Sequence, residues 1–285
     1  MASKKVRNVT GDVPLHWVGD GFPVRSLFSY RDAGLDPFLL LDYAEPHRFA
    51  ASNEQRGVEE HPHKGFETVT IVYQGELEHR DSAGNRGKVG PGDVQWMTAA
   101  SGIVHEEFHS ERFTRSGGML EVAQLWVNLP AVAKKVPPRY QEILNGQIST
   151  VRVDGASVRV IAGELQGTTG PAQTFTPIQL WDIQVEIAGE YWLPVPSGYT
   201  TALVVRNGSI ACNDSEHVRG VGLVVFEHEG DHIALKCEAP AAALLLAGKP
   251  INEPVVARGP FVMNTAEEIR QAFADYQSGA MGHLH

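Results

Sequence analysis

Two stretches of the sequence, TVTIVYQGELEHRD at residues 68–81 and TALVVRNGSIACND at residues 201–214, share one pattern. Aligned without gaps at an offset of 133, they match at Thr, Val, Gly and Asp and keep an aliphatic residue at two further positions. Each stretch has the pattern of a strand, a glycine turn and a second strand. Because the offset is close to half of the 285 residues, the repeat predicts two copies of one β domain, with the boundary in the segment 137–146.

Short strand-like runs separated by turn residues continue along the rest of the chain. Turn signals stand at 74–75, 81–87, 90–93 and 207–208. Regular short strands with glycine turns are typical of a sandwich or a barrel, so we expect an all-β fold. The clearest predicted strands are 67–73, 122–129, 157–161, 178–187, 201–205, 222–227 and 242–246.

One helix is predicted near the C-terminus, at residues 266–276. Thr265 is a suitable N-cap, and the acidic residues Glu267 and Glu268 suit the positive end of a helix. Apolar residues recur at helical spacing and form one apolar stripe, made of Ile269, Ala272, Phe273 and Tyr276.

Charge and composition exclude several classes of protein. Lys and Arg number 24 against 34 Asp and Glu, and this net charge of −10 disfavours direct binding to nucleic acid or to an anionic membrane. The longest apolar run, 241–247, is far shorter than the roughly 18 residues of a membrane span. Two cysteines, Cys212 and Cys237, make no disulfide framework. Because the N-terminal segment also lacks the apolar core of a secretion signal, we expect a cytoplasmic protein.

A His-x-His pair, His61 and His63, is the sharpest local feature of the sequence. On an extended strand, residues i and i+2 face the same side, so the pair directs two imidazoles at one spot. Imidazole nitrogens suit divalent transition metals. The pair therefore predicts part of a metal site, although among 12 histidines such a pair also arises by chance.

His105 and Glu107 form a second pair that shares one face of a predicted strand. Imidazoles and a carboxylate that converge with open coordination positions are typical of non-haem iron and similar divalent metals. Glu67 competes with Glu107 as the carboxylate ligand. It is separated from His61 and His63 by even numbers of residues, so on one continuous strand it would face the same side. Four residues of straight strand span about 13 Å, and only a turn at Gly65 would return Glu67 to the site. Spacing alone leaves both carboxylates open.

Five segments in a fixed order resemble the signatures of the pirins, a branch of the cupin superfamily. The resemblance runs from about residue 36 to residue 276, and Lys64 stands where the family often has arginine. The segments are HPHKGFETVT at 61–70, GDVQWMTA at 92–99, GIVH at 102–105, QLWVNLP at 124–130 and GPFVMNT at 259–265.

The resemblance implies a bicupin, in which two antiparallel β-barrels lie face to face and a helix follows at the C-terminus. It implies an N-terminal metal-binding barrel at 1–137 and a degenerate C-terminal barrel plus the helix at 138–285. Iron(II) is the metal expected for the family, and manganese, cobalt, nickel, copper or zinc would suit the same donors. Carried over by position, the ligands of one divalent metal are His61, His63, His105 and Glu107, which favours Glu107 over Glu67.

The internal repeat predicts that only the first barrel binds metal. At the offset of 133, His61 falls on Pro194 and His63 falls on Pro196. Proline has no ligating side chain, so the second barrel should lack the site.

Several residues near these motifs are expected to have structural roles. Phe66 and Trp126 are predicted to lie in the core rather than to form a substrate platform. We expect His79 and His109 at the surface or in loops. Lys64 is expected either at the mouth of the cavity, where it would attract an anionic substrate, or in solvent.

Two functions from different classes fit the resemblance. As an enzyme, the protein would be a quercetin 2,3-dioxygenase-like oxidoreductase that opens a flavonol or a related enol with O2, with Glu107 as the general base. As a regulatory protein, nuclear in a eukaryote, it would bind a transcription factor or a metabolic enzyme, with the metal as a redox or conformational sensor. The motifs are common to both, and the absence of a Lys/Arg localisation run favours the enzyme. In either case we expect no direct nucleic-acid partner and no membrane.

Overall fold

The computed structural model describes residues 2–32, 34–153, 155–213, 217–238 and 240–284 of the chain. Strands dominate these residues, which confirms the predicted all-β class. Two compact units make up the chain. Unit 1 contains Met1–Val13, Ala33–Pro37 and Gly146–Pro250, and unit 2 contains Pro14–Asp32, Phe38–Asn145 and Ile251–His285.

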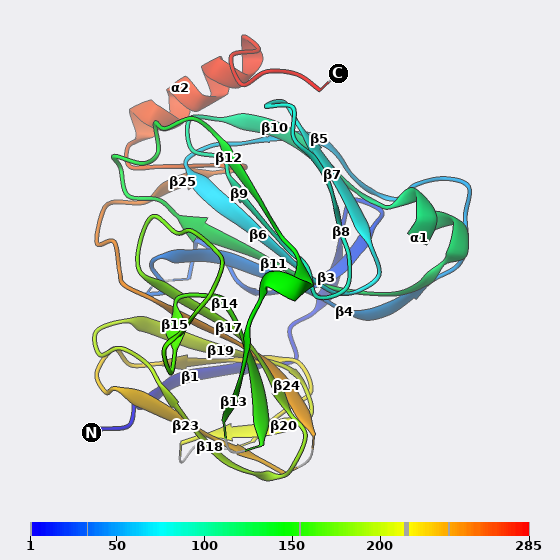
Figure 1. Cartoon of the computed structure of the whole chain (residues 1–285). Coiled ribbons are helices and arrows are strands. Elements are labelled where there is room, and N and C mark those ends of the chain that lie inside the picture. The colour runs from blue at the N-terminus through cyan, green and yellow to red at the C-terminus, as the bar shows by residue number, and fades with distance from the viewer. Residues whose placement is uncertain (1, 33, 154, 214–216, 239, 285) are drawn as a thin grey trace. The chain divides into compact units, whose positions relative to one another are not determined.

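Unit 2 contains two larger antiparallel sheets, one short hairpin and two helices (Figure 1). The seven-stranded sheet has the spatial order β12 (Arg139–Ile143), β9 (Val94–Thr98), β6 (Phe66–Gln74), β11 (Gly118–Asn128), β4 (Phe38–Phe49), β3 (Phe22–Phe28) and β2 (Leu15–Val18). The four-stranded sheet has the order β5 (Gly57–His63), β10 (Ile103–His109), β7 (Leu77–Asp81) and β8 (Arg86–Val89). The hairpin joins β25 (Val256–Arg258) to β26 (Phe261–Met263), and the helices are α1 (Glu111–Ser116) and α2 (Ala266–Gln277).

Unit 1 also contains one seven-stranded and one four-stranded sheet of its own. The seven-stranded sheet has the order β1 (Val6–Gly11), β22 (Gly222–Phe226), β19 (Thr200–Asn207), β24 (Ala241–Gly248), β17 (Ile178–Val185), β14 (Ala156–Ala162) and β13 (Thr150–Val153). The four-stranded sheet has the order β18 (Gly189–Pro194), β23 (His232–Cys237), β20 (Ser209–Cys212) and β21 (Val218–Arg219). A small hairpin joins β15 (Glu164–Leu165) to β16 (Thr168–Thr169), and a 3-10 turn, η1, covers Asn145–Gln147.

The two units have equivalent strand orders, as the internal repeat predicts. The first repeated stretch covers most of β6 and β7, and the described part of the second covers β19 and β20. β6 and β19 are each third in their seven-stranded sheet, and β7 and β20 are each third in their four-stranded sheet. The repeated stretch is therefore a strand–turn–strand element with the same place in both units.

The units group the chain differently from a single division after residue 137. β1 pairs with β22 and so belongs to unit 1, although it stands at the start of the sequence. β12 pairs with β9, and the segment that carries α2 also belongs to unit 2. Sheet edges are completed here by strands distant in sequence, which a linear reading of composition does not detect.

Helix α2 begins and ends close to its predicted bounds. The Thr265 hydroxyl accepts a hydrogen bond from the backbone N–H of Glu268, which confirms the N-cap. Ile269 and Ala272 are buried in a cluster that also contains Val104 of β10 and Phe261 of β26. Tyr276, the last residue of the predicted apolar stripe, is 38% exposed.

Helix α1 was not predicted from the sequence. It has only six residues, and the Ser110 hydroxyl caps it by accepting from the N–H of Phe113. A single turn and a half offers too few positions for an apolar period to stand out. Neither helix of the described chain is long and apolar enough to cross a membrane.

Candidate metal centre

The predicted ligands lie on two adjacent strands of the four-stranded sheet in unit 2. β5 and β10 are antiparallel, and His61 is the cross-strand partner of His105. His63, two residues after His61 on β5, is the cross-strand partner of Ile103. An irregularity in this ladder lies between His105 and Glu107. The alternation of a strand therefore brings His61, His63 and His105 to one side of the sheet.

Three imidazoles converge at this place. Nitrogen atoms of His61, His63 and His105, one from each, all lie within 4.8 Å of one another. The ring centroids of His61 and His105 are 4.3 Å apart, and the ring of His63 lies 4.9 Å from each of them. Glu107 belongs to a second, overlapping group with His105 and His79, again within 4.8 Å. His105 is thus common to both groups.

The state of the ring nitrogens suits a metal ion. Nδ1 of His63 and Nε2 of His105 are buried and have no hydrogen-bond partner among the described residues. Burial, followed by the proximity of His61, lowers the pKa of both rings well below the ordinary value of 6.5. Neutral imidazoles with free lone pairs in a buried site lack a partner that a divalent cation would supply. Nδ1 of His61 lies 2.7 Å from the Glu59 carbonyl oxygen, which leaves its Nε2 for the site.

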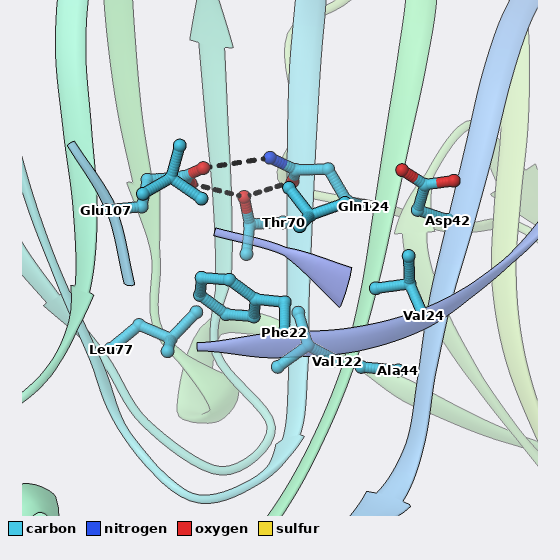
Figure 2. A pocket seen from close by; sticks show the side chains of 11 residues that line it. Phe22, Val24, Asp42, Ala44, Thr70, Leu77, Glu107, Val122 and Gln124 are labelled. Atoms are coloured by element: carbon cyan, nitrogen blue, oxygen red, sulfur yellow. Dashed lines mark hydrogen bonds between the residues drawn. The ribbon is translucent and has the colours of Figure 1, made fainter. Parts of the chain in front are cut away.

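Glu107 is held by two neutral side chains. Gln124 donates from Nε2 to Oε2 of Glu107 at 3.1 Å, and the Thr70 hydroxyl lies 3.2 Å from Oε1 (Figure 2). The same hydroxyl donates to Oε1 of Gln124 at 2.5 Å. Glu107 is only 8% exposed. These contacts fix the direction of the carboxylate without adding a positive charge beside it.

A cavity of about 50 Å³ adjoins Glu107, Thr70 and Gln124. Figure 2 shows that Glu107 and Asp42 lie toward opposite sides of this pocket and that apolar side chains lie below them. Hydrogen bonding from Ser26 lowers the pKa of Asp42 less than burial raises it, and the net shift is upward. The apolar part of the lining is Val18, Phe22, Val24, Ala44, Val58, Leu77 and Val122.

Glu67, the competing carboxylate, lies outside both donor groups. Gly65 has φ +90°, and a Cβ there would lie 1.9 Å from the Val262 carbonyl oxygen, so this turn requires glycine. After the turn, Glu67 accepts a hydrogen bond from Thr98 at 2.6 Å, and Arg139 lies 3.9 Å away. Burial raises the pKa of Glu67 to about 7. The choice of Glu107 over Glu67 as the ligand stays a prediction that this geometry favours.

Lys64 and the aromatic residues have identifiable partners. Lys64 donates to the Asp275 carboxylate of α2 at 2.5 Å, so it is not a freely solvated lysine. Phe66 is fully buried, as predicted. Trp126 is only half-buried, and its ring lies 4.3 Å from that of Phe66 and 5.2 Å from that of His63.

The prediction that His79 and His109 lie at the surface or in loops is wrong. His79 is 4% exposed on β7 and His109 is 2% exposed on β10. Nε2 of His109 donates to the Gly21 carbonyl oxygen at 2.9 Å. The two-residue period of a strand would have indicated that His79 is buried, because it lies on the same face of β7 as Leu77 and Asp81, which are also buried.

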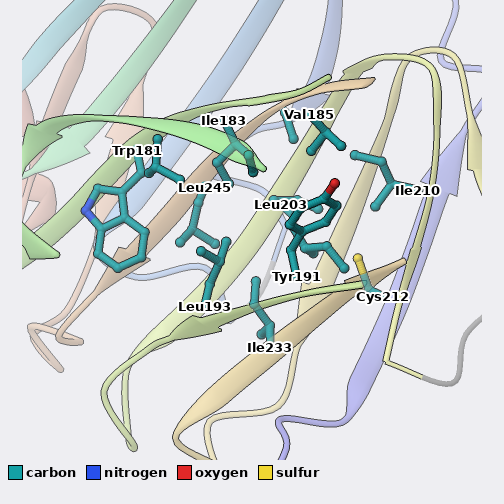
Figure 3. Packing of buried hydrophobic residues seen from close by; sticks show 14 of the residues in the cluster. Trp181, Ile183, Val185, Tyr191, Leu193, Leu203, Ile210, Cys212, Ile233 and Leu245 are labelled. Carbon is teal, nitrogen blue, oxygen red and sulfur yellow. The ribbon is translucent and has the colours of Figure 1, made fainter. Parts of the chain in front are cut away.

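Unit 1 carries apolar residues where unit 2 carries the histidines. In the equivalent pair of strands, Tyr191 of β18 is the partner of Leu235 of β23, and Leu193 is the partner of Ile233. All four lie in the buried apolar cluster whose packing Figure 3 shows. The pairing of β20 with β23 makes Ile233 the equivalent of His105, so its partner Leu193 stands where His61 does. Val195, two residues further along and in the same buried cluster, stands where His63 does. Each lies one residue before the proline that the gapless alignment indicated. Both metal-capable groups found in the described chain belong to unit 2.

Comparisons with known proteins agree with these features. The model of the family Pirin matches residues 22–127, and that of the Pirin C-terminal cupin domain matches residues 180–282. The chain is 50% identical to "Putative quercetin 2,3-dioxygenase PA2418" of Pseudomonas aeruginosa, over 99% of this chain and 100% of that protein. It is 41% identical to "Pirin-like protein" of Solanum lycopersicum, over 93% and 88% of the two chains. A crystal structure of quercetin 2,3-dioxygenase from Acinetobacter baumannii superimposes with a TM-score of 0.97 at 46% identity, over 100% of both chains.

Proposed function

The chain belongs to the pirin family, and from this membership we propose that it is a metal-dependent dioxygenase that opens a flavonol or a related enol with O2. The observation that carries the proposal is the buried cluster of three imidazoles with two unpartnered ring nitrogens beside Glu107. The similar Pseudomonas aeruginosa protein is named "Putative quercetin 2,3-dioxygenase PA2418", and the similar Acinetobacter baumannii structure is titled quercetin 2,3-dioxygenase, which supports the same assignment.

In this proposal four residues hold one divalent metal: His61, His63, His105 and Glu107. When bound, the metal supplies Lewis-acid and redox chemistry toward an enol oxygen and O2. Iron(II) is the expected ion. Manganese, cobalt, nickel, copper and zinc suit the same three-nitrogen, one-oxygen donor set.

Glu107 acts as the general base. A flavonol or enol must lose its hydroxyl proton to react, and a carboxylate oxygen of Glu107 accepts that proton. Gln124 holds the carboxylate by a hydrogen bond and is itself held by the Thr70 hydroxyl, so these neutral side chains orient Glu107 without adding a positive charge. Most of the side chains that line the adjoining cavity are apolar, so a substrate group that fills it would displace water and strengthen these interactions.

The size of the cavity sets a condition on the substrate. About 50 Å³ is well below the roughly 300–1,000 Å³ of typical small-molecule sites. A whole flavonol therefore requires its lining side chains to move, and Phe22 is the largest of them. Dioxygen or a small part of the substrate fits without such movement.

The small cavity also supports a second candidate function. A metal held beside so small a cavity suits a regulatory protein that binds a transcription factor or a metabolic enzyme, with the metal as a redox or conformational sensor. In that case any role at DNA is indirect, because the net charge of −10 gives no basic surface for phosphates.

Oxygen uptake distinguishes the two functions. We would load the protein anaerobically with iron(II), manganese(II), cobalt(II) or nickel(II) and measure O2 consumption with a panel of flavonols and smaller enols. The dioxygenase proposal predicts turnover that the double variant His61→Ala/His63→Ala loses. Metal binding without turnover of any enol would instead support the regulatory function.

A further inference from the structure

A buried chain of polar side chains reaches His105 from the side away from its free nitrogen. His79 lies next to His105, with Nδ1 of one ring 3.4 Å from Nδ1 of the other. On its other side, Nε2 of His79 lies 3.1 Å from Oδ2 of Asp81. Nε2 of Gln95 lies 3.2 Å from Nδ1 of His79. All four residues are at most 5% exposed, so water does not compete for these contacts.

The direction of each hydrogen bond follows from Asp81. This carboxylate also accepts from the backbone N–H groups of Ala83 and Asn85 and from the Asn85 amide. Burial raises its pKa, but these bonds and the one from His79 lower it more, so the net shift is downward. An ionised carboxylate only accepts hydrogen bonds, and the hydrogen between Asp81 and His79 therefore sits on Nε2 of His79.

A neutral His79 with its hydrogen on Nε2 has a lone pair on Nδ1. That lone pair accepts from the Gln95 amide and from His105. The shared hydrogen then sits on Nδ1 of His105, and the lone pair of His105 is on Nε2. Nε2 is the atom of His105 that is buried without a partner among the described residues.

The ring of His79 is also held in place by packing. Tyr140 stacks on it at a centroid distance of 5.1 Å and an interplanar angle of 24°. Gly87 is the ladder partner of His79 on β8, and a Cβ at Gly87 would lie 2.2 Å from the Tyr140 hydroxyl. A side chain at position 87 would push Tyr140 off the ring. The absence of one lets Tyr140 fix the plane of His79.

We propose that Asp81 and His79 are positioning residues that fix the tautomer and ring orientation of His105, so that its Nε2 lone pair is presented to the metal site. His79 itself is not a ligand, because its Nδ1 is occupied by donors and its Nε2 by Asp81. This inference rests on the proposed metal site only in taking His105 as a ligand. Carboxylates and other groups that accept the second N–H of a metal-binding histidine typically change metal affinity 10–100-fold.

Tautomers in the metal-free protein test the first part directly. Long-range ¹H–¹⁵N NMR of protein labelled with ¹⁵N-histidine, at about pH 7.5, distinguishes the two neutral forms of each ring. We expect His79 with its hydrogen on Nε2 and His105 with its hydrogen on Nδ1. In Asp81→Asn, the new amide donates to His79, so His79 should move its hydrogen to Nδ1 and His105 should lose its acceptor. A wild-type His105 protonated on Nε2, or a doubly protonated His79, would overturn the proposal.

Zinc(II) binding tests the second part, with zinc alone as the probe and a competing chelator to set the free concentration. His79→Leu and Asp81→Asn should each weaken zinc binding about 10–100-fold. His79→Asn should bind within about threefold of wild type, because its amide oxygen can replace the Nδ1 acceptor. On zinc addition, the ¹⁵N signals of His105 should shift strongly and those of His79 should keep their tautomer pattern.

A matched control is His109→Gln. His109 is a buried histidine on β10, the strand of His105, and the glutamine amide can still donate to the Gly21 carbonyl oxygen. It should bind zinc as wild type does. Three results would each refute the positioning role. They are an equal loss of zinc affinity in His109→Gln and His79→Leu, a zinc affinity of His79→Asn as low as that of His79→Leu, and direct zinc ligation by His79. If wild-type protein binds no zinc(II), nickel(II) or iron(II), the proposed metal function itself fails and the positioning role fails with it. If it binds metal but opens no enol, only the dioxygenase proposal fails.

Discussion

Glu107 differs from the three histidines in having both a predicted ligand role and a predicted proton-transfer role. Its two carboxylate oxygens contact Gln124 and Thr70, and neither neighbour carries a charge. The sequence indicated the residue through its spacing from His105. It could not indicate these neighbours, because β6 and β11 approach β10 only in the folded unit.

Replacing Glu107 by Gln should separate its two roles. The amide keeps the size and one oxygen, so metal binding should weaken but remain measurable at high metal concentration. Turnover at saturating metal and enol should fall by at least about 10²-fold, because the base is lost. Oxygen uptake of the fully loaded variant measures this. Glu106→Gln, which alters the neighbouring residue paired with Arg80, is the control, and near wild-type turnover of Glu107→Gln would refute the base.

Glu67 gives a prediction about stability and pH. Burial raises its pKa in the folded state to about 7 from the ordinary value of 4.5. Protonated Glu67 therefore stabilises the fold at low pH, and this contribution is lost as the pH rises through about 7. Glu67→Gln keeps an oxygen for the Thr98 hydroxyl and has no charge to bury.

Chemical denaturation of metal-free protein at pH 5 and pH 8 measures the effect. The free energy of unfolding of Glu67→Gln, relative to wild type, should increase by up to about 3 kcal/mol between these two pH values. The comparison with wild type cancels the opposite pH dependence of the buried histidines. A difference that does not change with pH would show that Glu67 is ionised throughout.

At the scale of elements, the turn after β5 is held by residues far away in the sequence. Val262 of β26 donates its N–H to the Lys64 carbonyl oxygen, and Gly65 donates to Ala100. The fully buried Lys134 donates to the carbonyl oxygens of Gly65 and Val262, at 2.6 and 3.0 Å, and to the side chain of Asn128. The strand that carries the His-x-His pair therefore ends in a turn with a cationic support.

Lys134→Met should destabilise unit 2, because it leaves three buried oxygen acceptors without the ammonium group. A loss of about 2–4 kcal/mol is expected in urea denaturation. Zinc affinity should fall as well, since the turn begins one residue after His63. The exposed neighbour Lys135→Met is the matched control and should change stability by less than about 0.5 kcal/mol. Equal stability of the two variants would show that Lys134 does not stabilise the turn after β5.

At the scale of the whole molecule, two units of one strand order differ in what fills the histidine positions. Unit 2 has imidazoles there, and unit 1 has Leu193, Val195 and Ile233 in an apolar core. Elemental analysis of tag-free, metal-loaded protein should therefore give one metal per chain. The variant His61→Ala/His63→Ala should lose it, whereas Leu193→Ala should keep it. A stoichiometry near two would contradict this assignment.

Metal binding should also raise the stability of the molecule, because the ligands converge only in the folded state. At a free metal concentration of 100 times Kd, the expected gain is about 2.7 kcal/mol. Thermal unfolding followed at several zinc concentrations measures it. A midpoint that does not depend on zinc in wild type, or that rises equally in His61→Ala/His63→Ala, would rule out the site as the cause.

The charge of the molecule predicts that it does not bind DNA by itself. With 34 acidic and 24 basic residues it offers no net attraction to phosphates. Fluorescence anisotropy with duplex DNA at about physiological salt should show no specific complex. Tight, salt-sensitive binding of the protein alone would refute this prediction.

The sequence by itself determined the features that depend on neighbours in the chain. Alternation and glycine turns predicted the all-β class, and the repeat predicted two units with equivalent strands. The N-cap at Thr265 depends on a contact three residues away, and it was predicted correctly. The same-face placement of His61 and His63 follows from the period of a single strand.

The tertiary structure alone decided what depends on contacts between distant segments. The gapless repeat pointed to Pro194 and Pro196, but the connection between β18 and β19 differs in length from that between β5 and β6. Leu193 and Val195 therefore stand at the equivalent positions. β1 pairs with β22, which lies more than 200 residues later in the chain. His79 was misplaced because its burial comes from β9, β10 and β12, none of which is adjacent to it in sequence. A local pattern fixes which face a side chain is on, whereas what covers that face is fixed only when the strands assemble.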